Sequence, residues 1–188
     1  TDAISPELLD ITIGEAIGRE DGRTLRVLLA NAHKGGKVAP DVLKKVWIYS
    51  ISTRSGIDLE TGAMTLQHAL GHTDSLVLAA EEHHCQDLLQ GLILQCTWYQ
   101  AAVVCEYMIR CGMTFGGDRE LFFITSGLMK SAVGMVRATQ LLTAVVEHQR
   151  DDVDGLFNYG KITRLSLSLH SEAHTMQHEL RRTHYTAR

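Results

Sequence analysis

Residues 25–71, LRVLLANAHKGGKVAPDVLKKVWIYSISTRSGIDLETGAMTLQHALG, contain the clearest structural signals in the chain. Leucines recur at helical spacing from Leu25, and the glycine pair after Lys34 tolerates the left-handed backbone that ends a helix. Pro40 suits the first turn of a new helix, where no N–H is needed. That helix is apolar round most of its circumference as far as Ile51, which is typical of a buried member of a helical bundle.

A polar connection follows this helix and is long for a loop inside a compact bundle, so it indicates a join between two sub-bundles. Strand-like alternation is almost absent, which predicts an all-α fold. One long helix is expected from Asp118 to Val145. The predicted parts are a first helical bundle at 1–53, a linker at 54–62, a second helical bundle at 63–148 and a helical carboxy-terminal segment at 149–188.

The composition sets the broad class of protein. The 188 residues are 45% hydrophobic, enough to bury a core in one domain or two small ones. No uncharged apolar run is long enough for a transmembrane helix, so we expect a protein that is soluble or at most peripheral to a membrane. The cysteine spacings match no zinc template and predict buried, unbridged thiols in a reducing compartment. These cysteines are Cys85, Cys96, Cys105 and Cys111.

Charge is distributed unevenly along the chain. Residues 55–109 contain seven Asp/Glu and no Lys or Arg, whereas residues 1–54 and 110–188 are slightly basic. One interpretation is that these are ordinary solvated faces. The other is that unlike regions of neighbouring copies attract and favour head-to-tail assembly. On the second interpretation, the residues predicted to mediate self-association are Asp58, Glu60, Asp74, Glu81, Glu82 and Asp87.

The helices, turn and linker of residues 25–70 also indicate a family. The features that carry the likeness, in order, are Leu25, Leu28, Pro40, the polar linker and the residues LQHAL at 66–70. Their order and spacing resemble the amino-terminal domain of the orthomyxovirus matrix protein family, as in influenza. Residues 99–102 and 127–128 continue the resemblance, which covers about two thirds of the chain. Because the chain is short, it fits a distant, isavirus-like member better than influenza itself.

This resemblance implies a non-enzymatic structural protein of the virion. Such a protein assembles with itself beneath the envelope, on the cytoplasmic face of the host plasma membrane, and bridges anionic lipid and the viral ribonucleoprotein. RNA is a further candidate partner and the nucleus a further candidate location. The predicted lipid contacts are Lys34, Lys37, Lys44, Lys45 and Arg54. The predicted ribonucleoprotein contacts are Lys161, Arg164, Arg181 and Arg182.

Two departures from the family narrow these expectations. Where the influenza proteins carry a basic run for nucleic-acid contact and nuclear import, this chain reads AEEHH at 80–84, which would repel a phosphate backbone. The region matching the family's Cys/His cluster contains only His148, so we assign no metal site and expect no cofactor. The alternative function is a histidine-rich helical protein that binds a metal ion or haem. It is favoured by His170, His174 and His178, which share one helix face.

The ten histidines make the net charge sensitive to pH, because charging all of them would move the formal value from −4 to +6. The histidines predicted to sense pH are His68, His72, His83 and His84. We expect acidification from about pH 7.5 to about pH 5 to weaken acidic-to-basic contacts between copies and loosen the array. Light scattering across this range measures the effect, and unchanged scattering would contradict the hypothesis.

Overall fold

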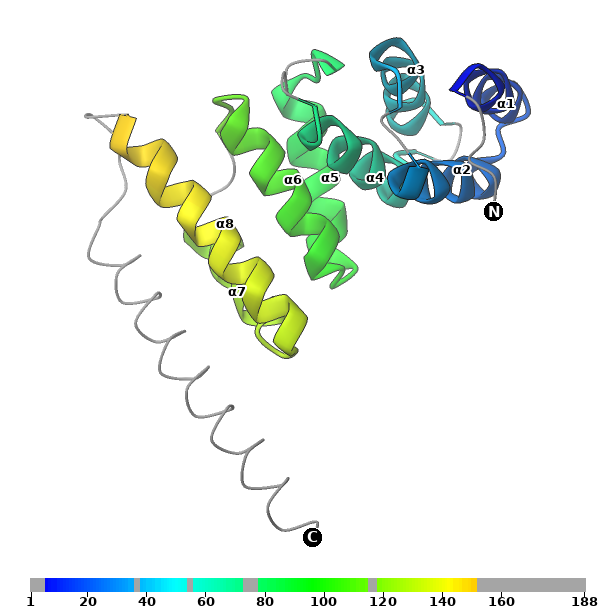
Figure 1. Cartoon of the computed structure of the whole chain (residues 1–188). Helices are drawn as coiled ribbons and strands as arrows, with labels where there is room; N and C mark the ends of the chain where they lie inside the picture. Colours follow the sequence, from blue (N-terminus) through cyan, green and yellow to red (C-terminus); the bar gives the residue numbers. More distant parts are fainter. Residues whose placement is uncertain (1–5, 36–37, 54–55, 73–77, 115–117, 152–188) are drawn as a thin grey trace, which may run out of the picture. The chain divides into compact units, whose positions relative to one another are not determined.

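The computed structural model describes residues 6–35, 38–53, 56–72, 78–114 and 118–151 (Figure 1). Within these residues the protein has eight α-helices and no β-sheet, which confirms the predicted all-α fold. The helices are α1 (Pro6–Gly18), α2 (Gly22–Gly35), α3 (Pro40–Ile51), α4 (Leu59–Leu70), α5 (Glu82–Leu94), α6 (Trp98–Arg110), α7 (Asp118–Leu128) and α8 (Ala132–Asp151).

Local side-chain chemistry explains where the early helices begin and end. Asp21 precedes α2 and accepts hydrogen bonds from the backbone N–H of Thr24 at 3.0 Å and from its hydroxyl at 2.6 Å. These bonds favour the carboxylate and lower the pKa of Asp21. The second helix ends at Gly35, and Pro40 opens α3 with Ala39 in an extended conformation before it. Both boundaries agree with the glycine and proline signals in the sequence.

The chain divides into a unit that ends at Ile124 and a second unit that begins at Thr125. Within the first unit, α4 is the central helix and contacts α2, α3, α5 and α6 (Figure 1). Most of the residues that α4 buries have small side chains, which allow four neighbouring helices to approach closely. The buried residues of α4 are Thr61, Gly62, Ala63, Thr65, Leu66, His68 and Ala69.

Two glycines set the close packing between α4 and α5. A β-carbon added at Gly62 would lie 3.2 Å from the Leu88 side chain, which is fully buried. In the opposite direction, a β-carbon at Gly91 would lie 2.6 Å from a methyl of Leu59. Each helix therefore presents a glycine to a leucine of the other. The absent side chains give the leucines their space, which offsets the lower helix propensity of glycine.

The connection before α4 ends earlier than the sequence predicts. Asp58 accepts a hydrogen bond from the backbone N–H of Thr61 at 3.1 Å and caps α4, so the helix begins at Leu59, inside the predicted linker 54–62. The backbone N–H of Asp58 donates to the carbonyl oxygen of Ser50 at 2.8 Å, which turns the chain back onto α3.

The division into units also differs from the predicted bundles at 1–53 and 63–148. Because α4 packs against helices that precede and follow the expected join, the described residues as far as Ile124 form one compact unit. Of the predicted carboxy-terminal segment 149–188, only the end of α8 is among the described residues.

The single long helix expected from Asp118 to Val145 is instead two helices. Helix α7 ends at Leu128, and Ser131 then accepts a hydrogen bond from the backbone N–H of Gly134 at 3.0 Å, in the first turn of α8. A β-carbon at Gly134 would lie 1.9 Å from the carbonyl oxygen of Leu128. The chain therefore turns back so tightly that only glycine fits at this position.

A polar cluster formed by Arg26, Asp58, Glu60 and Thr61 joins α2 to the beginning of α4. Nη1 of Arg26 lies 3.1 Å from Oδ2 of Asp58, whose side chain is only 18% exposed. Nε of Arg26 lies 3.2 Å from Oε2 of Glu60. The Thr61 hydroxyl donates to Asp58 at 2.9 Å. Asp58 therefore serves both as the cap of α4 and as the partner of a half-buried guanidinium.

We predict that Asp58→Ala lowers the free energy of unfolding by about 2 kcal/mol. About 1 kcal/mol of this loss comes from the missing helix cap. The rest comes from the loss of the ion pair between Asp58 and Arg26. Asp58→Asn keeps a capping oxygen and should lose about half as much. Urea denaturation followed by circular dichroism measures both values. The exposed Asp87→Ala on α5 is the control and should stay within about 0.5 kcal/mol of the wild type. Equal stability of Asp58→Ala and this control would contradict the assignment.

Candidate functional site

The outer face of α3 carries the described part of the predicted lipid contact. The inner face buries Val42, Leu43, Val46 and Trp47 against the core. Lys44 and Lys45 are exposed, and Ile48, one turn further along, is 60% exposed. Residues four positions apart on a helix are neighbours, so two positive charges and an apolar side chain lie together. We call Lys44, Lys45 and Ile48 the α3 face.

The other predicted lipid contacts add nothing to this geometry. Lys34 belongs to α2, but its side chain lies outside the described part of the chain. Lys37 and Arg54 also lie outside the described residues. Ile48 is not among the predicted lipid contacts, although it lies one turn from Lys44 in the sequence pattern. The sequence could not show that this isoleucine is exposed, because α3 is apolar on several sides.

Several predicted self-association residues are engaged within a single copy. Asp58 and Glu60 both contact Arg26, as described above. Glu82 accepts hydrogen bonds from the side-chain amide of Gln86 at 3.1 Å and from the backbone N–H of Thr114 at 3.3 Å, and the Thr114 hydroxyl also donates to it. Glu81 and Asp87 are exposed, and Asp74 lies outside the described residues.

Two of the predicted pH-sensing histidines connect α4 to neighbouring segments. Nε2 of His68, a buried residue, donates to the carbonyl oxygen of Leu29 in α2 at 2.9 Å. Nε2 of His72 donates to the carbonyl oxygen of Val38, just before α3, at 3.0 Å. His68 belongs to α4, whereas His72 lies two residues beyond the end of the helix at Leu70. These contacts lie within one copy, so the two rings support the packing of this unit.

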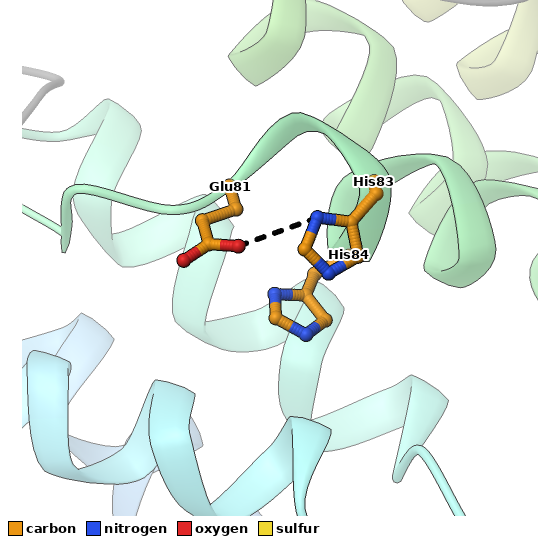
Figure 2. Close-up of side chains that lie close together, drawn as sticks. All are labelled: Glu81, His83 and His84. Atoms are coloured by element: carbon orange, nitrogen blue, oxygen red, sulfur yellow. Dashed lines mark ion pairs between the residues drawn. The ribbon is translucent and has the colours of Figure 1, made fainter.

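The other two predicted pH-sensing histidines lie at the exposed start of α5. Figure 2 shows the rings of His83 and His84 close to each other and the Glu81 carboxylate directed at His83. Nδ1 of His83 is 3.3 Å from Oε2 of Glu81, and the ring centroids of the two histidines are 3.9 Å apart. The sequence predictions give Glu81 a role in self-association and the two histidines a role in pH sensing. The run EEHH at a helix start was the signal that could have united them.

The remaining predicted contacts lie outside the described residues. These are the ribonucleoprotein residues Lys161, Arg164, Arg181 and Arg182 and the histidine face His170, His174 and His178.

Among the helices that the structure describes, none has the length and apolar character needed to span a bilayer. No family model, curated protein or solved structure matches the chain. Its function must therefore be inferred from its own residues.

The four cysteines differ in exposure, although all were expected to be buried. Cys85 and Cys105 are buried, Cys111 is half-buried and Cys96 is exposed in the turn between α5 and α6. Burial raises the pKa of both Cys85 and Cys105 to about 12, because a thiolate is poorly solvated among apolar side chains. No disulfide links any of these four residues.

We predict that iodoacetamide at pH 8 labels Cys96 quickly and leaves Cys85 and Cys105 almost unmodified. A raised pKa keeps a thiol protonated at all pH values below it, and at pH 8 a pKa near 12 lowers the thiolate fraction by roughly three orders of magnitude relative to an ordinary cysteine. Peptide mass spectrometry over time measures each site. Unfolding in urea is the control and should make all four react. Equal rates for Cys85 and Cys96 in the folded protein would contradict the prediction.

Proposed function

We propose that this chain is a viral matrix protein: a non-enzymatic structural protein that assembles beneath an envelope and contacts anionic membrane through the α3 face. The observation that carries the proposal is the grouping of Lys44, Lys45 and Ile48 on one exposed helix surface. Lysines attract anionic headgroups, and an apolar side chain beside them can enter the boundary between headgroups and acyl chains. The sequence resemblance to orthomyxovirus matrix proteins supports the same interpretation.

The energetics of this face favour an assembly over a single bound copy. Each lysine near an anionic surface contributes about 1 kcal/mol, and burial of the exposed part of Ile48 adds about 1 kcal/mol more. The sum corresponds to a dissociation constant weaker than about 1 mM for one copy. Stable binding therefore requires many copies that act together, since linked sites gain avidity without new contacts. Self-association is thus a condition of the proposed membrane contact.

In the proposed assembly, the opposite side of the layer contacts the viral ribonucleoprotein. The carboxy-terminal segment is the candidate for this contact because it contains the basic residues Lys161, Arg164, Arg181 and Arg182. Direct RNA binding belongs to this proposal as a further partner, and phosphate contacts of this kind weaken steeply with salt. The proposed locations are the virion beneath the envelope and the cytoplasmic face of the host plasma membrane, with the nucleus as an additional candidate.

We predict that the protein floats with anionic liposomes at low salt, and that Lys44→Glu/Lys45→Glu weakens this binding about thirtyfold or more. Loss of two lysine contacts removes about 2 kcal/mol, and the new glutamates add repulsion. Ile48→Ser should weaken binding less and make the remainder more sensitive to salt. Flotation gives the bound fraction, and electron microscopy of the floated material reports whether an ordered coat forms.

A matched control makes the same charge change elsewhere. Arg119→Glu/Lys130→Glu alters two exposed basic residues outside the α3 face and should bind nearly as well as the wild type. Equal binding to neutral and anionic liposomes would overturn the proposed membrane contact. The same conclusion would follow if both double variants lost binding equally, since net charge rather than the α3 face would then control it.

A further inference from the structure

Three side chains with metal-binding groups converge at the start of α5. The ligand atoms of Glu81, His83 and His84 all lie within 4.8 Å of one another. Two of these residues are well exposed, with side chains of His83 and Glu81 that are 62% and 68% accessible. Figure 2 shows that all three come from one short segment, with Glu81 just before the helix and the two rings in its first turn.

The backbone explains why the carboxylate faces the rings. Glu81 occupies the cap position of α5 in an extended conformation, with φ −82° and ψ 142°, and its side chain makes no capping hydrogen bond. A glutamate in this position is too long to cap as aspartate or serine does. Its carboxylate instead reaches Nδ1 of His83. The adjacent Glu82 instead accepts a hydrogen bond from the backbone N–H of Thr114.

Two of the candidate ligand atoms already lie at the separation that a tetrahedral metal site requires. Zinc bound to imidazole and carboxylate has metal–ligand distances of about 2.0–2.2 Å, so its ligand atoms lie about 3.3–3.5 Å apart in a tetrahedron. Nδ1 of His83 and Oε2 of Glu81 are 3.3 Å apart. The ring of His84, at 3.9 Å between centroids, needs only side-chain rotation to direct a nitrogen at the same point. Glu81 and His83 are exposed and His84 is half-buried outside the core, so these side chains can rotate without disturbing the packing.

From this geometry we propose that Glu81, His83 and His84 bind a divalent transition-metal ion of the zinc class. Two imidazoles and one carboxylate favour Zn²⁺, Ni²⁺ or Cu²⁺ over Ca²⁺ and Mg²⁺, which prefer oxygen ligands. Three protein ligands leave at least one coordination position to water or to a donor from another molecule. The proposal is independent of the membrane contact, because it shares no residue with the α3 face.

Two features make this a weak and exchangeable site. The amino-terminal end of a helix carries a partial positive charge, which opposes a bound cation. The carboxylates of Glu81 and Glu82 offset that charge locally. Exposure of Glu81 and His83 also means that the ion competes with water for these two ligands. A site of this kind adds an ion to a fold that forms without it, unlike a closed structural zinc centre.

The test is a Zn²⁺ titration of the full chain, freed of metal and of any histidine tag, in competition with a chromophoric chelator. We expect His83→Ala/His84→Ala to raise the dissociation constant more than about tenfold, since loss of even an outer-shell partner can cost that much. Glu81→Gln keeps the size of the side chain and should give a smaller increase. Cu²⁺ bound to the wild-type chain should show coupling to two imidazole nitrogens by electron paramagnetic resonance.

Two controls separate this site from other histidines and carboxylates. Asp87→Asn changes an exposed carboxylate of α5 outside the trio and should bind Zn²⁺ as the wild type does. His170→Ala/His174→Ala/His178→Ala removes the other histidine group and should leave the Cu²⁺ signal of two nitrogens in place. Loss of that signal in the triple variant, unchanged affinity in His83→Ala/His84→Ala or absence of Zn²⁺ binding by the wild type would each overturn the proposal. Because this copper measurement needs no substitution at Glu81, His83 or His84, loss of the two-nitrogen signal in the triple variant overturns the proposal even if the double variant unfolds.

Discussion

The carboxylate of Asp58 is the constraint on which the first unit depends. This carboxylate caps α4 through Thr61 and pairs with Arg26 of α2. The backbone N–H of Asp58 donates to the carbonyl oxygen of Ser50 at the end of α3. One residue therefore contacts three helices. A negative charge at the amino-terminal end of a helix also interacts favourably with the helix dipole, so the cap and the ion pair reinforce each other. The direction in which α4 leaves this point then determines which surfaces α3 and α5 can offer to a partner.

The small side chains of α4 allow the neighbouring helices to pack closely around it. Helices approach closely where glycine, alanine and threonine replace larger residues, and Gly62 and Gly91 provide this at the contact with α5. His68 of α4 and His72, just after the end of this helix, add directional hydrogen bonds to Leu29 and Val38. The core therefore tolerates little change in α4. The α3 face and the Glu81, His83 and His84 group lie outside that core, so substitutions there can test function without altering the packing.

Much of the fold followed from the sequence, because its strongest signals are local. Glycine and proline act through backbone conformation alone, which is why the end of α2 and the start of α3 at Pro40 were predicted correctly. The predicted start of α4 is too late, because Asp58 lies in a polar run and only its contact with Thr61 shows that it caps a helix. The faces of the histidines were also beyond prediction. His68 and His72 have the same spacing as any exposed helical pair, and only tertiary contacts show that they donate to carbonyl groups in other segments.

The same difficulty applies to the acidic middle of the chain. A count of charges treats all seven carboxylates of residues 55–109 as available, but Asp58 and Glu60 face Arg26, and Glu106 pairs with Arg110. Contacts within one copy therefore satisfy part of the charge that the sequence assigned to neighbours. The exposed remainder is screened over about 10 Å at ordinary ionic strength, and exposed ion pairs contribute little. In the proposed assembly, charge then orients neighbouring copies, and apolar contacts must supply most of the affinity between them.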